Sequence, residues 1–468
     1  MIYHINIAFR TDFSIREENI IKRKNEFFEK IGSYSGIHTF AEKYDVEISP
    51  KKPSKSTISY ESARVDSHLV EKSTPILFTI LPGNSTKATI KEIFADSIRG
   101  HKILNEKFVE WMDKYCVLSL FNNTFATLSF DFKVETQKSE FHGLLDELEI
   151  WANSFAKTIT NELYTKVLLP FFEELRKEDQ FNFFTGSGHH PGFPDVISKD
   201  SELKLTGRVI CGKPRSVSRV IISNGDSNSI RKIGDHWIIS SGLKDELMEN
   251  FSSTDEKKRV YLGWMNSLII NDREAKIVED ALFSLNLMLF YYYIFESLNL
   301  SLTDVISLSH KKRSVKETRR FKQMLENIIF TADNVKVNFN DVSQGLQRNR
   351  AYFFNELSER WTLDLVLENI QNKIRICKDN IQKIYQQAFN RSQKFAELLL
   401  FFLSSVALLE FFKGIAEFTH KADTLDDKVW GVYSVAKQLD PNSMLWLGFS
   451  TIVFLFLIYS RILKEKNG

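Results

Sequence analysis

The chain has 468 residues and a nearly balanced charge, with 62 Lys and Arg against 60 Asp and Glu. This length accommodates two or three folding units, and a net charge of +2 argues against direct nucleic-acid binding or a strongly acidic substrate. The three cysteines are far apart and lack metal-site spacing, which is typical of free thiols in a reducing compartment. No apolar core follows the N-terminus, so we expect no cleaved signal peptide.

The first 340 residues alternate β-rich runs with helical stretches, which predicts a mixed α/β body within a chain of the α+β class. The Asn122-Asn123 pair predicts a tight hairpin between two of the strands. The predicted strands are 3–9, 75–81, 117–121, 124–132, 208–212, 219–223, 236–241 and 259–270, and the predicted helices are 137–179, 272–300 and 314–333.

A basic segment, GKPRSVSR at 212–219, carries the residue types that bind phosphate. It predicts that Lys213, Arg215 and Arg219 lie in a turn between two strands, where they would suit a phosphate or nucleotide anion. The same pattern is compatible with a solvated hairpin tip that binds nothing. We retain these three residues as the ligand-binding candidates of the body.

A glycine-rich segment, GSGHHPGFPD at 186–195, contains His189, His190 and Asp195. Adjacent histidines point in different directions on any regular element, so the segment favours a flexible loop over a metal site, and no metal ligands are assigned. Its glycines match neither GxGxxG nor Walker A spacing. We also find no Ser-His-Asp, Cys-His or HExxH arrangement, and therefore predict that the protein is not an enzyme.

The C-terminal part predicts a long helix, because residues from Gln347 to Lys413 include neither glycine nor proline. One helix over this stretch would be about 100 Å long. Its apolar residues recur with alternating steps of four and three, which is the seam of packed long helices. That seam consists of Leu363, Leu367, Ile370, Ile374, Cys377, Ile381, Ile384 and Ala388.

Two apolar segments, 395–412 and 444–463, approach the length needed to cross a bilayer. A third apolar run, 281–295, is shorter and predicts a buried helix of the body. Lys and Arg precede the first segment and follow the second, and the connection between them is mildly acidic. This distribution predicts that both termini are cytoplasmic and that the connection is external.

One face of the first segment keeps polar groups at membrane depth. Because such groups usually face protein or water rather than lipid, several copies of this helix around an axis would enclose a pathway. Phe401 and Leu408 would then form hydrophobic constrictions. Alternatively, the Glu397 side chain extends to the cytoplasmic surface of the membrane, and Ser404 and Ser405 bond backbone carbonyls of the helix or aid helix packing. The predicted pore-lining residues are Asn390, Lys394, Glu397, Phe401, Ser404, Leu408 and Ile415.

The body, the long stalk and the two terminal spans together resemble the CorA superfamily of divalent-cation channels. The resemblance implies a homopentamer in the cytoplasmic (inner) membrane, with the first spans around the pore. The family motif Gly-Met-Asn, or Gly-Ile-Asn, corresponds here to Gly414, Ile415 and Ala416. Alanine replaces the asparagine whose amide would hold a hydrated divalent cation. Glu417 follows and offers an anionic ring at the pore mouth instead.

With this altered motif, the chain resembles the divergent CorA-like proteins found beside type III CRISPR systems. That resemblance implies a channel gated by a nucleotide second messenger in antiviral defence. The alternatives are a constitutive transporter of Mg, Zn or Co, and a membrane-anchored binding protein that does not conduct. The predicted parts are a cytoplasmic α/β domain at 1–270, a helical hairpin at 271–340, a stalk helix at 341–394, a first span at 395–418, an external loop at 419–443 and a second span at 444–463.

Overall fold

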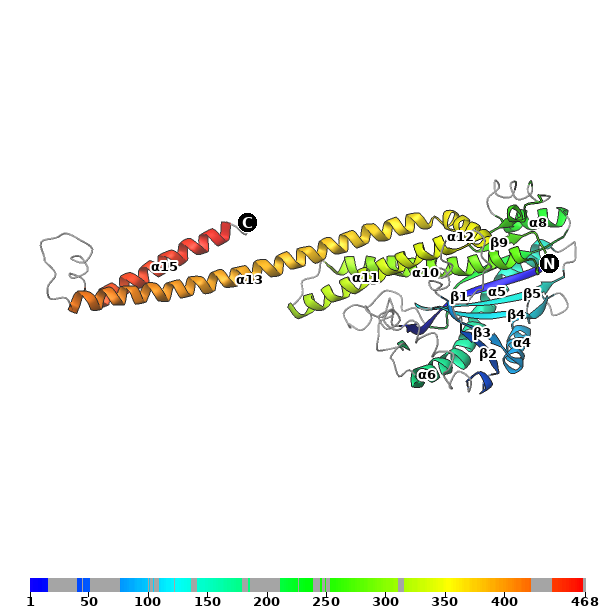
Figure 1. Cartoon of the computed structure of the whole chain (residues 1–468), viewed down its shortest axis with the longest axis horizontal. Coiled ribbons are helices and arrows are strands. Elements are labelled where there is room, and N and C mark those ends of the chain that lie inside the picture. Colours follow the sequence, from blue (N-terminus) through cyan, green and yellow to red (C-terminus); the bar gives the residue numbers. More distant parts are fainter. Residues whose placement is uncertain are drawn as a thin grey trace, which may run out of the picture. The chain divides into compact units, whose positions relative to one another are not determined.

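The computed structural model has an α+β fold, and the chain forms two compact units, Met1–Lys378 and Asp379–Gly468 (Figure 1). The described residues are 1–15, 40–43, 45–50, 76–99, 101, 104, 109–121, 123–135, 141–178, 184–185, 211–225, 227–238, 245, 249, 253–309, 315–421 and 440–465. The predicted loop at 186–195 and most of the predicted external loop lie outside these residues.

A single mixed sheet forms the centre of the first unit. Strand β1 lies between β5 and β7, with antiparallel pairing on both sides, and β7 pairs in parallel with β9. The strand order is β2-β3-β4-β5-β1-β7-β9-β8, and β6 also pairs with β1. The strands are β1 (Ile2–Ile15), β2 (Val46–Pro50), β3 (Ile76–Pro82), β4 (Val109–Phe121), β5 (Asn123–Val134), β6 (Phe184–Thr185), β7 (Pro214–Ile222), β8 (Val260–Tyr261) and β9 (Asn266–Ile269).

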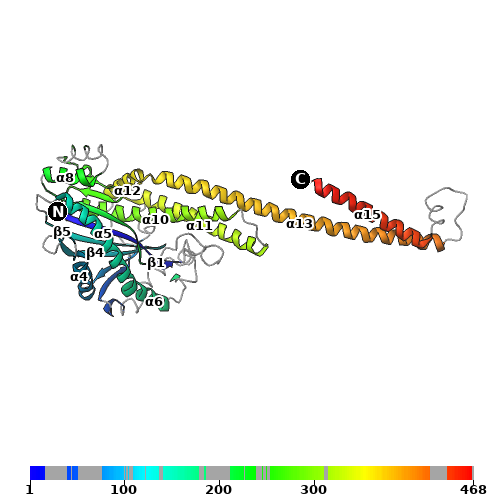
Figure 2. The same cartoon turned by 180° about the vertical axis from the view of Figure 1, so that it is seen from behind.

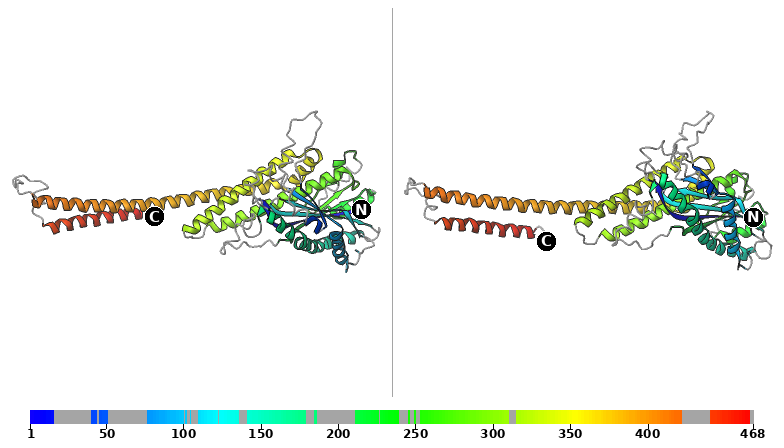
Figure 3. Two further views of the ribbon diagram at one scale, coloured as in Figure 1. Left: turned by 60° about the horizontal axis from the view of Figure 1, so that its bottom comes forward. Right: turned by 90° about the horizontal axis from the view of Figure 1, so that it is seen from below.

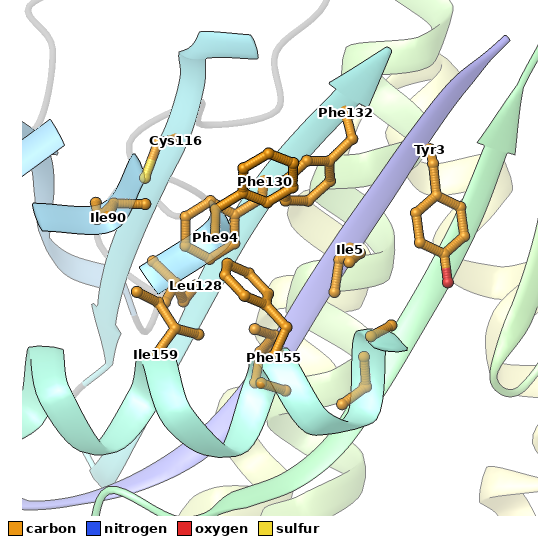
Figure 4. Packing of buried hydrophobic residues seen from close by; sticks show 14 of the residues in the cluster. Tyr3, Ile5, Ile90, Phe94, Cys116, Leu128, Phe130, Phe132, Phe155 and Ile159 are labelled. Carbon is orange, nitrogen blue, oxygen red and sulfur yellow. The ribbon is translucent and has the colours of Figure 1, made fainter. Parts of the chain in front are cut away.

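One face of the sheet carries an aromatic core. Alternation along β1 places Tyr3 and Ile5 on this face, because successive side chains of a strand point to opposite sides. Helices α4 (Asn84–Ile98) and α5 (Phe141–Leu163) cover it (Figure 2). Phe94, Phe130, Phe132 and Phe155 lie close together in this layer (Figure 4). Ring centroids of Phe132 and Trp151 are 4.9 Å apart in an edge-to-face arrangement, a favourable geometry for aromatic pairs.

Helix α10 (Lys276–Ser309) packs against the other face of the sheet and contacts β1 and β5. Most of the side chains in its apolar stretch are buried. The prediction of a buried helix over 281–295 is therefore confirmed. The remaining described helices are a π-helical turn (Tyr164–Leu168), α6 (Leu169–Glu178), α8 (Ser227–Trp237), a 3-10 turn (Glu256–Arg259), α11 (Val315–Gly345), α12 (Arg348–Arg360), α13 (Leu363–Lys421) and α15 (Pro441–Glu465).

Two of the predicted strands differ from what the described residues show. The segment expected at 236–241 overlaps the end of helix α8, whose Ile230, Ile233 and Trp237 are buried at helical spacing. A short apolar run does not distinguish a strand from a helix, and here the packing of the preceding turns decides. The strand expected at 259–270 is instead the short antiparallel pair β8 and β9, joined by a turn.

Several other predictions are confirmed. Strands β4 and β5 form the hairpin expected around Asn122-Asn123. The long helical stretch expected at 137–179 runs from α5 through the π-helical turn to the end of α6. Helix α11 corresponds to the helix expected at 314–333 and extends beyond it.

The single helix predicted over 347–413 is wrong at its N-terminal end. Helix α12 ends at Arg360, and Thr362 adopts a left-handed φ of 49°, which is unusual for a β-branched residue. Buried Trp361 explains the break, because its ring packs 4.9 Å from that of Trp264 and 5.8 Å from that of Tyr292. From Leu363 onward, α13 continues for 59 residues and includes the first predicted span.

Candidate functional site

The most distinctive surface of the chain is an apolar stretch of α13. Residues Gln393–Ile415 are long and apolar enough to cross a membrane, and none of this window is buried. Helix α10 is also long and apolar enough to cross a membrane, but 72% of the residues in its apolar stretch are buried, as in the core of a soluble unit. Helix α15 contributes a shorter apolar stretch, Asn442–Leu457. An exposed apolar area of this size is typical of a surface that contacts a partner or a membrane.

Helix α15 packs along one side of α13 in the second unit (Figure 3). The rings of Phe401 and Phe456 lie 5.8 Å apart. A Cβ atom added to Gly448 would lie 2.9 Å from the Phe412 ring, so this glycine permits the two helices to approach closely. The side of α13 that contains Phe401 and Phe412 is therefore in contact with α15 of the same chain.

The predicted pore-lining residues are divided between two environments. Asn390, Lys394 and Ser404 are exposed, whereas Glu397, Phe401, Leu408 and Ile415 are half-buried. Within this second group, Phe401 contacts α15, and the Glu397 carboxylate accepts a 3.1 Å hydrogen bond from Gln393 Nε2. Whether this set lines a pathway stays a prediction.

The opposite side of α13 is open. Leu403 is two residues from Phe401, which rotates it by about 200° around the helix. A line of residues at intervals of seven follows this side: Ala396, Leu403, Glu410 and Glu417, and all four are exposed. At the predicted pore mouth, Gly414 faces open space, and Lys413 Nζ lies 3.8 Å from Glu417 Oε1.

The three predicted ligand-binding residues do not form one site. Arg215 and Arg219 belong to strand β7 rather than to a turn, which corrects the sequence-based expectation. Arg215 Nη2 bonds to Glu296 Oε2 of α10 at 3.0 Å, whereas the Nη1 atom of buried Arg219 lies 2.7 Å from Glu149 Oε1 of α5. Because α5 and α10 cover opposite faces of the sheet, these guanidinium groups bind the layers together.

This arrangement predicts different effects for two neighbouring cations. Replacing Arg219 with methionine should lower the free energy of unfolding by about 1–3 kcal/mol, because it removes a buried ion-paired group. Replacing exposed Lys213 with methionine should change it by less than about 0.5 kcal/mol. Urea unfolding of the full chain in detergent, followed by tryptophan fluorescence, measures both. Equal losses would contradict a structural role for Arg219.

A buried polar layer lies between the sheet and α10. His4 Nδ1 is 2.5 Å from one oxygen of Asp131, and Arg273 Nε donates to the other oxygen at 2.5 Å. Asn6 Nδ2, on the same face of β1 as His4, donates to Asn286 Oδ1 of α10 at 2.6 Å. Burial raises the pKa of Asp131, but the proximity and hydrogen bonds of His4 and Arg273 outweigh it and hold this pKa below its usual value.

Sequence reasoning missed this layer. Polar residues alternate with apolar ones in β1 and β5, a pattern that normally indicates a solvent-facing side. The signal in the sequence was an ionisable residue within each of two largely apolar strands, His4 and Asp131, which the structure places at paired positions.

Helix α10 contacts both the sheet and the part of α13 that belongs to the first unit, residues 363–378, which we call the root of α13. At its N-terminal end, Asp280 Oδ1 bonds to Arg350 Nε of α12 at 2.7 Å. Farther along, Lys373 Nζ of α13 donates to Asn299 Oδ1 at 2.5 Å and to Thr303 Oγ1 at 2.6 Å. Burial lowers the pKa of Lys373. A displacement of α10 against the sheet therefore reaches α12 and α13 through direct contacts.

Comparisons with protein-family models, with curated proteins and with solved structures found no match. Among the residues that the structure describes, no group of three or more His, Cys, Asp and Glu side chains is arranged to hold a metal ion.

Proposed function

We propose that this protein is a CorA-like ion channel of the cytoplasmic membrane, a homopentamer whose body responds to a soluble ligand. The observation that supports this most directly is the apolar stretch at 393–415, in which no described side chain is buried and which continues a helix whose first turns contact the body. Its length matches the hydrocarbon core of a bilayer. The resemblance to CorA supports five copies around the first span.

The open side of α13 is the better candidate for the pathway. Helix α15 already contacts the side that contains Phe401, so neighbouring copies and the axis have access to the side that contains Leu403 and Glu410. A carboxylate at membrane depth is costly when it faces lipid and is normally turned toward protein or water. Rings of Glu410, with Glu417 at the mouth, would attract cations.

Gating would depend on the contacts that α10 makes with the root of α13. A ligand shifts a conformational equilibrium only by its difference in affinity for the two states. Ligand binding at the body or at the root of α13 would alter how α13 is held by Asn299 and Thr303, and this change would be transmitted along a continuous helix. A messenger nucleotide is the ligand that the resemblance implies.

Ion release from liposomes containing the purified full chain tests this function. We expect cation release that depends on an added nucleotide. The double variant Leu398→Lys, Phe402→Lys should fail to insert, because both side chains are exposed away from the line of Leu403 and Glu410, and each lysine at the centre of a span costs about 3 kcal/mol. Leu365→Lys is the matched control, since Leu365 is an exposed leucine of the same helix outside the apolar stretch. Absence of ion passage under every ligand would reject the proposal.

A further inference from the structure

A groove of about 340 Å³ opens at the root of α13, between α10, α11 and α13. This volume is within the range of small-molecule sites. The groove belongs to the first unit and does not include the three ligand-binding residues predicted from the sequence. Its lining residues are Phe295, Ala332, Asp333, Lys336, Leu367, Ile370, Gln371, Ile374, Arg375 and Lys378.

The floor of the groove is apolar. Phe295, Ala332, Ile370 and Ile374 line the groove and are all buried. A ligand that rests on this floor would make van der Waals contact with apolar side chains rather than with hydrated polar groups. The floor therefore favours a ligand with a flat or bulky apolar portion.

The rim of the groove is cationic. Lys336 from α11 and both Arg375 and Lys378 from α13 lie around it, against a single carboxylate, Asp333. Lys378 Nζ lies 3.7 Å from Asp333 Oδ2, but both side chains are more than half exposed, so this ion pair is weak. Among the described side chains that line the groove, the ion pair is that of Lys378 and Asp333, and it does not involve Lys336 or Arg375. Arginine and lysine at one rim suit a phosphate group.

We propose that this groove binds a small soluble organic phosphate, with the phosphate at the rim and an apolar group such as a nucleotide base on the floor. The ligand would contact α10, α11 and the root of α13 together. A regulatory role for this binding rests on the proposed channel function. A ligand there stabilises whichever packing of these helices encloses it best.

A soluble ligand fits better than a lipid headgroup. Lys378 is the groove residue nearest in sequence to the apolar stretch, and it precedes Gln393 by fifteen residues (393 − 378). This separation in the sequence favours a soluble ligand, and competition between ADP and lipid vesicles tests that choice.

Fluorescence titration of the full chain in detergent with trinitrophenyl-ADP tests the site. We expect saturable binding that unlabelled ADP displaces. Arg375→Glu and Lys336→Glu should each weaken it at least tenfold, and Gln371→Trp, which fills the groove without a change of charge, should weaken it similarly. Lys383→Glu is the matched control, because Lys383 is an exposed cation of the same helix outside the groove, and it should change affinity less than twofold.

Three results would overturn the inference: no saturable binding, equal loss with Lys383→Glu, or displacement by phosphatidylglycerol vesicles but not by ADP. Inorganic phosphate competing as strongly as ADP would contradict the role of the apolar floor. Binding that follows the expected pattern in a chain that passes no ions would retain the site and reject the channel. Ion passage without binding at this groove would retain the channel and reject the site.

Discussion

Replacing Asp131 with alanine is expected to lower the free energy of unfolding of the first unit by about 3–5 kcal/mol. The Asp131 side chain is fully buried, and its two oxygens contact His4 and Arg273. Removing the carboxylate leaves a guanidinium group with only 10% of its side chain exposed and without that partner. Urea unfolding of the full chain in detergent measures the loss.

Asp113→Ala is the matched control for this substitution. Asp113 lies on strand β4, its side chain is 63% exposed, and its ion pair with Lys87 spans 3.6 Å. We expect a change of less than about 1 kcal/mol, because exposed ion pairs contribute little. A loss with Asp131→Ala no larger than this would show that the buried network does not hold β1, β5 and the start of α10 together.

The same carboxylate predicts how stability depends on pH. Because the pKa of Asp131 is lower in the folded state than its ordinary value of 3.8, its contribution is complete above that value. The contribution is lost as the pH falls through the lowered pKa. Asp131→Asn keeps the shape of the side chain and removes the titration, so its unfolding free energy should decrease less steeply below about pH 4 than that of the unmodified chain.

Glu410→Gln is expected to reduce cation release from liposomes by about tenfold, or about 1.4 kcal/mol in a barrier. In a ring of subunits this substitution removes one carboxylate per copy from the open side of α13. Glu397→Gln is the matched control, because Glu397 is half-buried on the side toward α15 and already accepts a hydrogen bond from Gln393. Its effect should be less than about twofold.

The reverse outcome is equally informative. If Glu397→Gln reduces ion release and Glu410→Gln does not, the pathway follows the stripe predicted from the sequence, and α15 must leave Phe401 in the assembled protein. Stopped-flow measurements with a cation indicator inside the liposomes distinguish the two cases. Protein recovered in the liposome fraction should be equal for both variants, so that insertion is controlled.

Sequence patterns alone were sufficient for features that depend on local chemistry. The apolar stretch of α13, the buried helix α10 and the β4–β5 hairpin follow from the length and period of apolar runs, which are properties of neighbouring residues. The α+β class follows from the same patterns. The absence of glycine and proline also predicted a long helix, and α13 has 59 residues.

Contacts between distant segments decided the rest. Trp361 ends α12 because its ring packs against Trp264 and Tyr292, whose positions no local pattern reports. Helix α10 covers the sheet face that contains His4 and Asp131 and makes both residues interior. The alternating pattern of the strands does not report this, because a polar strand face can be exposed to solvent or covered by another element. Packing of α15 likewise determines which side of α13 is open, because helical periodicity defines two faces but not which of them meets a neighbour.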